Sequence, residues 1–386
     1  MDSERHSPLR IAMLIQSYFP RLGGAERQLA SLAPLLEKHG AQIRIFTRRY
    51  DRALSPFEKV GGVPVYRLPV PGPKPLAALS FSTAAMPLLR EFKPHLIHAH
   101  ELLSPATTAV IAKRIFGVPV VAKVLRGGEL GDLAKLKKRT FGARRIETIK
   151  RGTDAFIVIS REIDSELEQV GVPPEQRVFI PNGVDLNRFA PPFPEEKTAV
   201  RRSLNLPDGL IAVFSGRLDP EKRVGQLINT WRELVGRYPD ATLLILGTGV
   251  EEAGLKRIAA PNVRFEGVVG DVSPYFRASD VFVLPSSTEG LSNSLLEAMA
   301  SGLALVATSV GGATDLVETG KSGILIQPDD PQAILSALTD LFESSGLRAR
   351  LGANARRRVE REYSLSVVAE KLNSLYRKFA PRAKWK

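Results

Sequence analysis

The sequence predicts an α/β protein made of two doubly wound parallel sheets, one after the other along the chain. Short apolar runs alternate with amphipathic helical patterns through most of the 386 residues, which is typical of consecutive β-α-β units. The chain is also longer than a single hydrophobic core usually supports. A stretch rich in proline and asparagine, residues 181–200, interrupts the pattern near its middle. We therefore expect two Rossmann-like domains.

The strand candidates of the first half are 10–15, 42–47, 63–68, 95–98, 118–123, 155–159 and 177–180, with helical patterns at 25–39, 77–92, 102–116 and 162–170. Those of the second half are 210–215, 242–246, 263–266, 281–284, 304–307 and 323–326, with helical patterns at 223–238, 291–301 and 331–342. We expect domains at 1–190 and 191–363. The basic helical pattern at 364–379 matches the first half in charge, so we expect residues 364–386 to cross back to the first domain.

Composition indicates a soluble protein of a reducing compartment. The chain has no cysteine, 44% hydrophobic residues and 25% charged residues, which excludes disulfides and thiolate metal sites. The first apolar segment, residues 11–15, is too short for a signal peptide or a membrane span. We expect a cytoplasmic protein.

The net charge of +13 is unevenly distributed. Residues 1–190 carry about +11, residues 191–364 about −3 and residues 365–386 about +5. The densest basic segment runs from Lys135 to Arg151, followed by the tail RKFAPRAKWK. Either segment could be a solvated face, or both could bind an anionic membrane surface. Aromatic residues do not interleave the basic run, which argues against nucleic acid.

The stretch from Asp280 to Gly323 predicts a strand, a loop and a helix, with two glutamates that have seven residues between them. Glu289 and Gly290 lie in the loop, and Glu297 lies in the helical pattern. Backbone N–H groups at the predicted helix start, Leu291, Ser292 and Asn293, suit a phosphate. Carboxylates accept hydrogen bonds from sugar hydroxyls. The alternative is that both glutamates are ordinary surface residues.

A second cluster follows the strand candidate 210–215. Gly216, Arg217 and Lys222 surround a turn, and two cations at a strand end suit a diphosphate. Surface pairing with the neighbouring Asp219 and Glu221 is the alternative. Gly247, after the next strand candidate, could admit a nucleotide against the backbone.

Two further features lie in the first half. Gly23 and Gly24 follow the first strand candidate without the G-x-G-x-x-G spacing of dinucleotide sites; they either let a ligand approach the backbone or merely form a tight corner. His98 and His100 end a strand. We interpret them mainly as structural, with contact between His100 and a bound substrate as the alternative.

Several segments, in order and spacing, resemble family-four retaining glycosyltransferases, which have the two-domain GT-B fold. They are GGAERQLASLA, HLIHAHE, IPNGVDLNRF, GRLDPEKRV, EGLSNSLLEAMASG and VGGATDLVETGKSGILI. The most specific part is Glu289-x7-Glu297, followed about fifteen residues later by Gly311-Gly312. The resemblance covers nearly the whole chain.

The resemblance implies a role for each matching residue. Arg217 and Lys222 would bind the donor diphosphate, Glu289 would contact the donor sugar, and Glu297 would bind the ribose. Gly23 and Gly24 would face the donor phosphates and the acceptor. The expected donor is a nucleoside-diphosphate sugar, UDP ahead of GDP, and the acceptor is a saccharide, a lipid-linked saccharide or a small molecule.

The sequence departs from the family at two positions. Leu125 or Arg126 stands where a histidine is common, and Asp315 stands where glutamate is usual. No Asp-x-Asp metal motif is evident, so we expect metal-independent transfer. Cations and a helix start would stabilise the departing diphosphate, with same-face attack preferred over a covalent intermediate on Glu289. The alternatives are an epimerase or hydrolase on the same fold, and a basic membrane-binding protein without catalysis.

Overall fold

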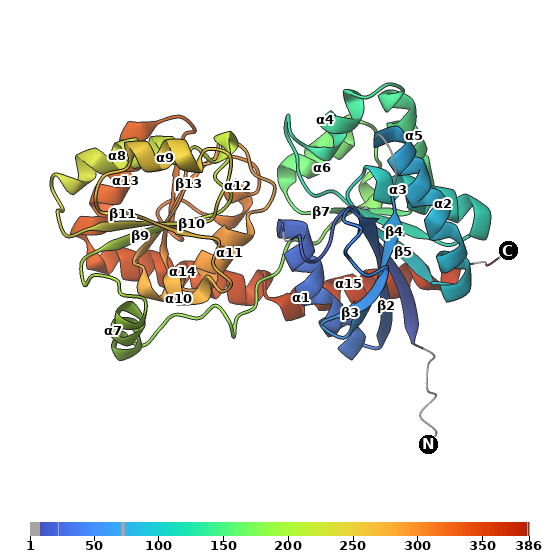
Figure 1. Cartoon of the computed structure of the whole chain (residues 1–386), viewed down its shortest axis with the longest axis horizontal. Coiled ribbons are helices and arrows are strands. Elements are labelled where there is room, and N and C mark those ends of the chain that lie inside the picture. The colour runs from blue at the N-terminus through green and yellow to red at the C-terminus, as the bar shows by residue number, and fades with distance from the viewer. Residues whose placement is uncertain (1–7, 22, 71–73, 384, 386) are drawn as a thin grey trace, which may run out of the picture. The chain divides into compact units, whose positions relative to one another are not determined.

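The computed structural model describes residues 8–383 and Trp385, apart from residues 22 and 71–73. Its chain divides into two compact units (Figure 1). The first unit takes in the chain up to Asn182 and again from Leu365; the second is Gly183–Ser364. The polar amino terminus at 1–7, Leu22 beside the glycine pair, and Lys384 and Lys386 of the basic tail lie outside the described residues.

The boundary between the units lies eight residues earlier than the predicted 190/191. Val184 already belongs to the second unit, because its N–H donates to the carbonyl of Tyr363 at 2.9 Å and it forms a parallel bridge with Ser364. The chain re-enters the first unit at Leu365.

The first unit contains a sheet of order β3-β4-β2-β1-β5-β6-β7-β8. Its strands are β1 Leu9–Ile15, β2 Ala41–Arg49, β3 Phe57–Val60, β4 Val63–Pro69, β5 Leu96–His100, β6 Val120–Lys123, β7 Ala155–Val158 and β8 Arg177–Phe179. Its α-helices are α1 Gly24–Lys38, α2 Lys74–Phe92, α3 Ser104–Phe116, α4 Asp132–Lys137, α5 Gly142–Gly152, α6 Arg161–Gln169 and α15 Leu365–Phe379. The strands pair in parallel except β3, an antiparallel edge strand that the sequence pattern did not predict.

The second unit contains a parallel sheet of order β11-β10-β9-β12-β13-β14. Its strands are β9 Ile211–Ser215, β10 Thr242–Leu246, β11 Val263–Gly267, β12 Val281–Leu284, β13 Ala304–Thr308 and β14 Ile324–Ile326. Its α-helices are α7 Pro194–Ser203, α8 Val224–Val235, α9 Glu252–Ile258, α10 Ser273–Ala278, α11 Asn293–Ala300, α12 Ala313–Leu316, α13 Pro331–Glu343 and α14 Ser345–Glu362. Helices α8, α9 and α13 pack together over one face of the sheet, and α11 and α14 pack together over the other (Figure 1).

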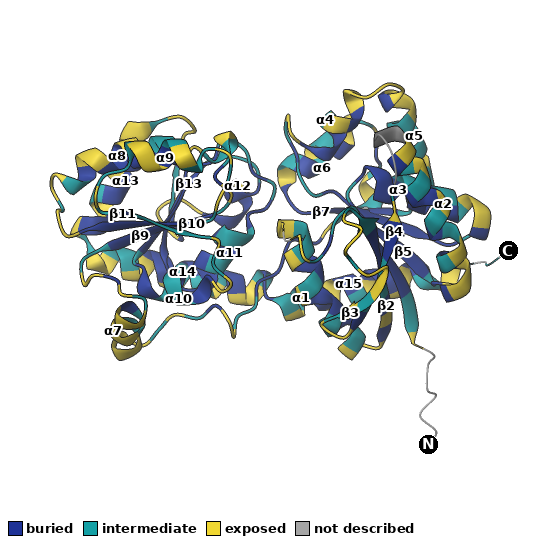
Figure 2. Cartoon of the chain, viewed as in Figure 1, coloured by how far each residue is buried: buried dark blue, intermediate teal, exposed yellow. Residues whose placement is uncertain are grey.

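Both sheets are buried, as parallel sheets covered on two faces must be. Every residue of β9, β10, β12 and β13 is buried, and Figure 2 shows exposed residues gathered on the outer sides of the helices. The sequence pattern did not predict α7 and α14, because both are rich in charge. Helix α14 turns a narrow stripe inward, namely Leu351, Gly352, Ala355 and Val359. No helix in the described ranges is long and apolar enough to cross a membrane.

The last helix, α15, packs in the first unit through apolar contacts and a buried hydrogen bond. It packs against α1, and its Tyr376 hydroxyl shares a 2.7 Å hydrogen bond with Nδ1 of His98 on β5. Burial lowers the pKa of His98 well below its usual value, so the neutral ring can accept a hydrogen bond from the hydroxyl. Trp385 stacks on Phe116 and donates to the carbonyl of Pro94 at 3.1 Å.

Replacing Tyr376 by phenylalanine should lower the free energy of unfolding of the first unit by about 1–3 kcal/mol, because it leaves the buried Nδ1 of His98 unpaired. Urea denaturation monitored by circular dichroism measures the change. Tyr238→Phe is the control, since its hydroxyl bonds Glu343 near the surface. Equal stability of the two variants would contradict the anchoring role.

Candidate active site

The second unit has a topological switch point between β9 and β12. From β9 the chain proceeds outward through β10 and β11, whereas from β12 it proceeds the other way through β13 and β14. Loops at the carboxyl ends of two such strands part to opposite sides of the sheet and leave a crevice where ligands bind. The loops in question begin after Ser215 and Leu284, and they carry most of the predicted donor-site residues.

These two loops are joined by an ion pair between Lys222 and Glu289. The Nζ atom of Lys222 lies 2.5 Å from Oε1 of Glu289, and the two side chains are only 15% and 9% exposed. The backbone supports the pair, because Ser287 donates its N–H to the carbonyl of Glu221 at 2.8 Å. The structure thus brings together two residues that lie 67 positions apart. Attraction between opposite charges is stronger in such a mostly buried site than at the surface, because the effective dielectric constant is lower.

Arg217 does not join this pair in the structure. Its side chain is 64% exposed and bonds the carboxylates of Asp219 and, at 3.1 Å, Glu221. The alternative weighed for Arg217, surface pairing with its neighbours, is the arrangement observed. The expectation that both cations converge on one point therefore needs correction: Lys222 turns inward to Glu289, while Arg217 is held by its own loop.

Gly216 and Gly247 bring two loops into direct backbone contact. A Cβ at Gly247, whose φ is +130°, would lie 1.9 Å from the carbonyl oxygen of Gly216. The N–H of Gly216 donates to the carbonyl of Leu246 at 3.0 Å. Both glycines thus serve the packing of the loops that follow β9 and β10. On the side where a Cβ of Gly247 would project, the space is occupied by this backbone. The predicted contact between Gly247 and a nucleotide stays a prediction.

The predicted helix start is displaced by two residues. Helix α11 begins at Asn293, and Ser292 is its N-cap, accepting a hydrogen bond from the N–H of Leu295 at 3.3 Å. Leu291 therefore precedes the cap, and the positive end of the helix dipole lies at Ser292 and Asn293. Glu297 is the fifth residue of α11, little more than one turn from its start, and is half-buried.

The glycine pair after β13 holds the Glu289 loop in place. A Cβ at Gly311, whose φ is +49°, would lie 2.0 Å from the carbonyl oxygen of Glu289, and the N–H of Gly312 donates to the carbonyl of Gly290 at 2.7 Å. Sequence reasoning noted this pair but gave it no role. Two adjacent glycines directly after a strand were the available signal, because they permit close backbone approach.

In the first unit, Gly23 and Gly24 stand at the start of α1, with Gly23 as its N-cap. The carboxylate of Glu26 folds back over this start: its Oε2 accepts the N–H of Gly23 at 3.0 Å, and the Ser17 hydroxyl bonds its other oxygen. Glu26 was missed as a site residue, although a glutamate three residues into a helix is a known capping signal.

His100 is placed in the interior rather than at a ligand. It is 6% exposed, its ring stacks on His98 at 4.1 Å, and its Nε2 faces the sulfur of Met13 at 3.4 Å. Burial, with nearby Lys123, lowers the pKa of His100 to about 3. This placement agrees with the structural interpretation of His100, and the structure offers no contact that favours a substrate role for it.

The region where the family commonly has a histidine is organised by Asp132. Its Oδ2 accepts the N–H groups of Leu125 and Leu102, each at 3.2 Å, and the residue is 1% exposed. Burial raises the pKa of Asp132. The side chain thus ties the loops after β5 and β6 together. No sequence signal pointed to it.

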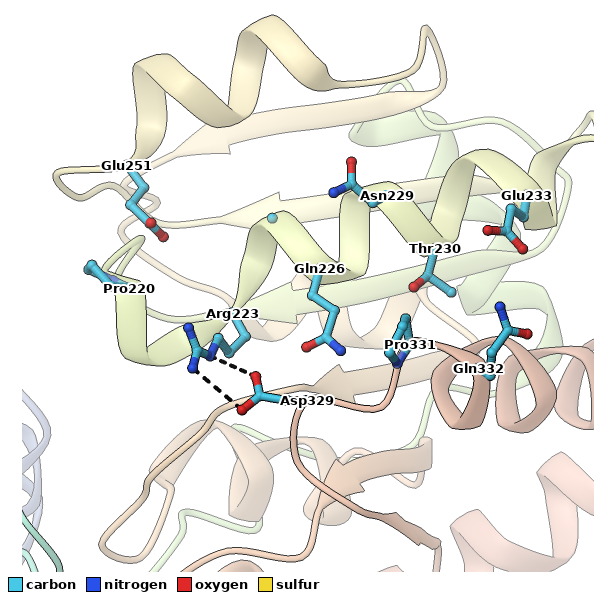
Figure 3. A pocket seen from close by; sticks show the side chains of 11 residues that line it. Pro220, Arg223, Gln226, Asn229, Thr230, Glu233, Glu251, Asp329, Pro331 and Gln332 are labelled. Atoms are coloured by element: carbon cyan, nitrogen blue, oxygen red, sulfur yellow. Dashed lines mark hydrogen bonds and ion pairs between the residues drawn. The ribbon is translucent and has the colours of Figure 1, made fainter.

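A cavity of about 590 Å³ opens between α8 and the start of α13 (Figure 3). Gln226, Asn229 and Thr230 line it from α8, and an ion pair of 3.0 Å between Arg223 Nε and Asp329 Oδ1 stands at one end. Neither Lys222 nor Glu289 lines the cavity. It is therefore separate from the pair at the switch point.

Comparison with known proteins identifies the family. A family description, "Glycosyl transferase 4-like domain", matches residues 23–183, and "Glycosyl transferases group 1" matches residues 209–344. A D-inositol 3-phosphate glycosyltransferase of Streptomyces scabiei is 30% identical over 90% of this chain and 86% of its own length. The chain therefore belongs to the family-four, group 1 glycosyltransferases, as its motifs predicted, and is an enzyme of that class.

Two further proteins are similar to this chain. A GDP-mannose-dependent phosphatidylinositol monomannoside mannosyltransferase of Corynebacterium glutamicum is 34% identical over 51% of this chain and 55% of that protein. The structure of Anabaena HepE in complex with UDP and glucose superposes with a TM-score of 0.79 and is 21% identical in sequence. The match covers 96% of this chain and 100% of that one. At that identity the likeness supports the fold alone, and it confirms the predicted GT-B architecture.

Replacing Gly311 by alanine should displace the Glu289 loop and reduce sugar-transfer activity on the order of a hundredfold, as expected for a small misplacement of a site residue. Activity and melting temperature are measured together. Gly320→Ala is the control, because Gly320 also has positive φ, +75°, but a Cβ there meets nothing within 4 Å. If G311A and G320A lose activity equally, backbone strain alone is responsible and the positioning role fails.

Proposed function

We propose that the protein transfers a sugar, with retention of anomeric configuration and without a metal, from a nucleoside-diphosphate sugar to an acceptor hydroxyl. The observation that carries this proposal is the buried Lys222–Glu289 pair at the switch point of the second unit. The named relatives use GDP-mannose or act on D-inositol 3-phosphate. The acceptor class therefore includes saccharides, lipid-linked saccharides and small molecules, and either UDP or GDP could carry the sugar, with UDP expected first.

The ion pair can bind both the diphosphate and the sugar of such a donor. A lysine ammonium has three N–H donors, so Lys222 can keep Glu289 while donating to a phosphate oxygen. Glu289 has further lone pairs for the hydroxyls of the sugar. Lys222 then neutralises charge that grows on the diphosphate as the glycosidic bond breaks, and Glu289 orients the sugar whose anomeric carbon becomes positive.

Arg217 is accessible to a ligand. Its side chain is 64% exposed, whereas the carboxylates that it bonds, Asp219 and Glu221, are 16% and 17% exposed. A diphosphate with two negative charges can bind the guanidinium through its planar fork of donors. The start of α11 at Ser292 and Asn293 adds the positive end of a helix dipole, and Glu297 would hold the ribose.

Same-face attack within an ion pair remains the preferred route. A covalent route would need Glu289 as nucleophile, but its carboxylate is engaged by Lys222 at 2.5 Å, which lowers its nucleophilicity. Within the described part of the chain, no group of three or more histidine, aspartate or glutamate side chains could hold a metal ion. Lys222, Arg217 and the helix start would stabilise the leaving group.

Replacing Lys222 by alanine should weaken donor binding and lower the rate of transfer on the order of a hundredfold to a thousandfold, the usual cost of losing one charge-stabilising group. Glu289→Gln should retain nucleoside-diphosphate binding but lose transfer. A thermal-shift screen of UDP-, GDP- and ADP-sugars identifies the donor, because a ligand that binds only the folded state raises the melting temperature.

Lys256→Ala is the matched control, since Lys256 is half-exposed in the same unit and forms its ion pair with Glu252 on its own helix. A K222A variant with unchanged donor binding and rate would refute the proposed site. Rapid conversion of the donor to an epimer, or to free sugar, in the absence of any acceptor would favour the epimerase or hydrolase alternative.

We also propose that the protein acts in the cytoplasm and binds the inner membrane face peripherally through its basic segment. In the structure this segment forms α4, α5 and the turn between them, where Lys137, Lys138 and Arg139 are exposed. Phe141, in the same turn, is 73% exposed. An exposed aromatic ring beside lysines suits the interface of an anionic bilayer, because the ring enters the headgroup region while the lysines bind phosphates.

A double replacement, Lys137→Gln with Lys138→Gln, should weaken binding to anionic vesicles at low salt by about 1 kcal/mol per lysine, or roughly thirtyfold in all. Vesicle sedimentation measures the loss. Lys256→Gln with Arg257→Gln removes the same charge from an exposed part of the second unit and should have little effect. Equal losses in the two variants, or no sedimentation of the wild type, would contradict a basic membrane face.

A further inference from the structure

The first unit has a switch point of its own, between β1 and β5. The chain passes from β1 outward to β2 and β4, and from β5 in the other direction to β6, β7 and β8. The loop after β5 leads from Glu101 into α3 at Ser104. A crevice is expected at this edge of the sheet for the same geometric reason as in the second unit.

Two arginines from different elements meet on the first turn of α3. Arg48, at the end of β2, donates from a terminal guanidinium nitrogen to Oγ of Ser104 at 2.7 Å. Arg145, on α5, donates from Nε to Oγ1 of Thr107 at 2.9 Å. Residues three positions apart lie on one face of a helix, so both guanidinium groups are held beside the amino-terminal turn of α3.

Neither guanidinium has an ion-pair partner among the residues that the structure describes. Other inward-turned arginines do: Arg67 pairs with Glu58, and Arg201 pairs with Asp280. The Nε atom of Arg48 is also buried without a hydrogen-bond partner. Both arginines are half-buried, and Arg48 also lies over the ring of Phe81 at 5.8 Å. Because their printed hydrogen bonds go to neutral hydroxyls, the two guanidinium groups leave an excess of positive charge beside the first turn of α3.

The electrostatics agree with the geometry. Burial lowers the pKa of both Arg48 and Arg145, and the positive charge of Arg139 lowers the pKa of each further. Two arginines and the positive end of the α3 dipole therefore act on the same region, with Arg139 nearby. Such an arrangement favours an anion with several acceptor oxygens.

Glu101 is the acidic group whose charge acts on both arginines, and its backbone is strained. Its φ is +92°, a left-handed conformation that is unfavourable for a residue with a side chain. Burial raises the pKa of Glu101 to about 7, so the carboxyl is only partly ionised near neutral pH. The charged groups around it are Asp132 and Lys135 of α4, Arg48 of β2, Glu26 of α1, and Arg145 of α5.

We propose that Arg48 and Arg145, together with the first turn of α3, bind a phosphate group carried by the acceptor, and that Glu101 receives a hydroxyl of the same molecule. This inference rests on the proposed function, since it names the acceptor class. A guanidinium pair provides planar donors for phosphate oxygens. The phosphate could belong to a soluble sugar or polyol phosphate, or to a phospholipid headgroup.

Titration calorimetry with glucose 6-phosphate and glycerol 3-phosphate tests the soluble source. Vesicles of phosphatidylcholine with and without phosphatidylinositol test the lipid source. All titrations use the full chain carrying Lys222→Ala, so that the donor site does not take up the phosphate. We expect binding in one of the two arms, and replacing Arg48 or Arg145 by glutamine should weaken that binding at least about tenfold. Arg48→Lys, which keeps the charge but loses the fork, should give an intermediate loss.

Arg114→Gln is the matched control, because Arg114 is exposed near the other end of α3 and its loss changes the net charge equally. The proposal is overturned if the Lys222→Ala protein binds neither probe, if both glutamine variants bind as tightly as their parent, or if R114Q weakens binding as much. Should R48Q fail to fold, the R145Q result decides. Donor binding, measured by thermal shift on the single variants R48Q and R145Q, should be unchanged, so a failure here is distinguishable from failure of the proposed transfer.

The pH dependence separates ligand contact from a structural role. Above pH about 7 the carboxyl of Glu101 is mostly ionised, and a carboxylate near the bound phosphate repels it. The affinity of the Lys222→Ala parent relative to the same protein with Glu101→Gln should therefore fall between about pH 6 and about pH 8, and the two should be similar at the lower end. A ratio of affinities that does not change with pH would overturn the placement of Glu101 beside the phosphate.

Discussion

The close approach of backbones at the carboxyl edge of the second sheet is the constraint on which the candidate active site depends. Gly247 lies against the carbonyl of Gly216, and Gly311 lies against the carbonyl of Glu289. Neither contact leaves room for a side chain. Because the loops are fixed in this way, a lysine that follows β9 and a glutamate that follows β12 meet at ion-pair distance. The positions of these two charged side chains therefore depend on glycines, which have no reactive side chain.

The two units differ in how their inward-facing cations are paired. In the second unit the central cation, Lys222, is neutralised by Glu289 and keeps N–H donors for a ligand. In the first unit Arg48 and Arg145 bond hydroxyls of α3, and the acidic group that acts on them, Glu101, is only partly ionised near neutral pH. The first arrangement is nearly neutral before a ligand arrives, whereas the second retains positive charge. The difference is consistent with a diphosphate that forms and departs in one site and a phosphate that is simply held in the other.

Much of the fold was predictable because the strands are short apolar runs separated by amphipathic helices. The strands with every residue buried, such as β12, were the clearest. Prediction failed where local pattern and tertiary role diverge: α14 is strongly charged and turns only a narrow stripe inward, and β3 is a short edge strand with no fully buried residue. The boundary at Asn182 was also missed, because it depends on a backbone contact between Val184 and the distant Tyr363.

The sequence by itself determined the family, the order of the elements and the residue types that a diphosphate and a sugar require, since these are carried by local spacing such as Glu289-x7-Glu297. It could not determine which of two nearby cations turns inward, because Lys222 and Arg217 are equally suited in charge and lie on one loop. Only the tertiary structure decided this, by placing a buried carboxylate within reach of Lys222 and leaving Arg217 in solvent. The same holds for Asp132 and Arg48, whose roles arise from contacts between elements far apart in the chain.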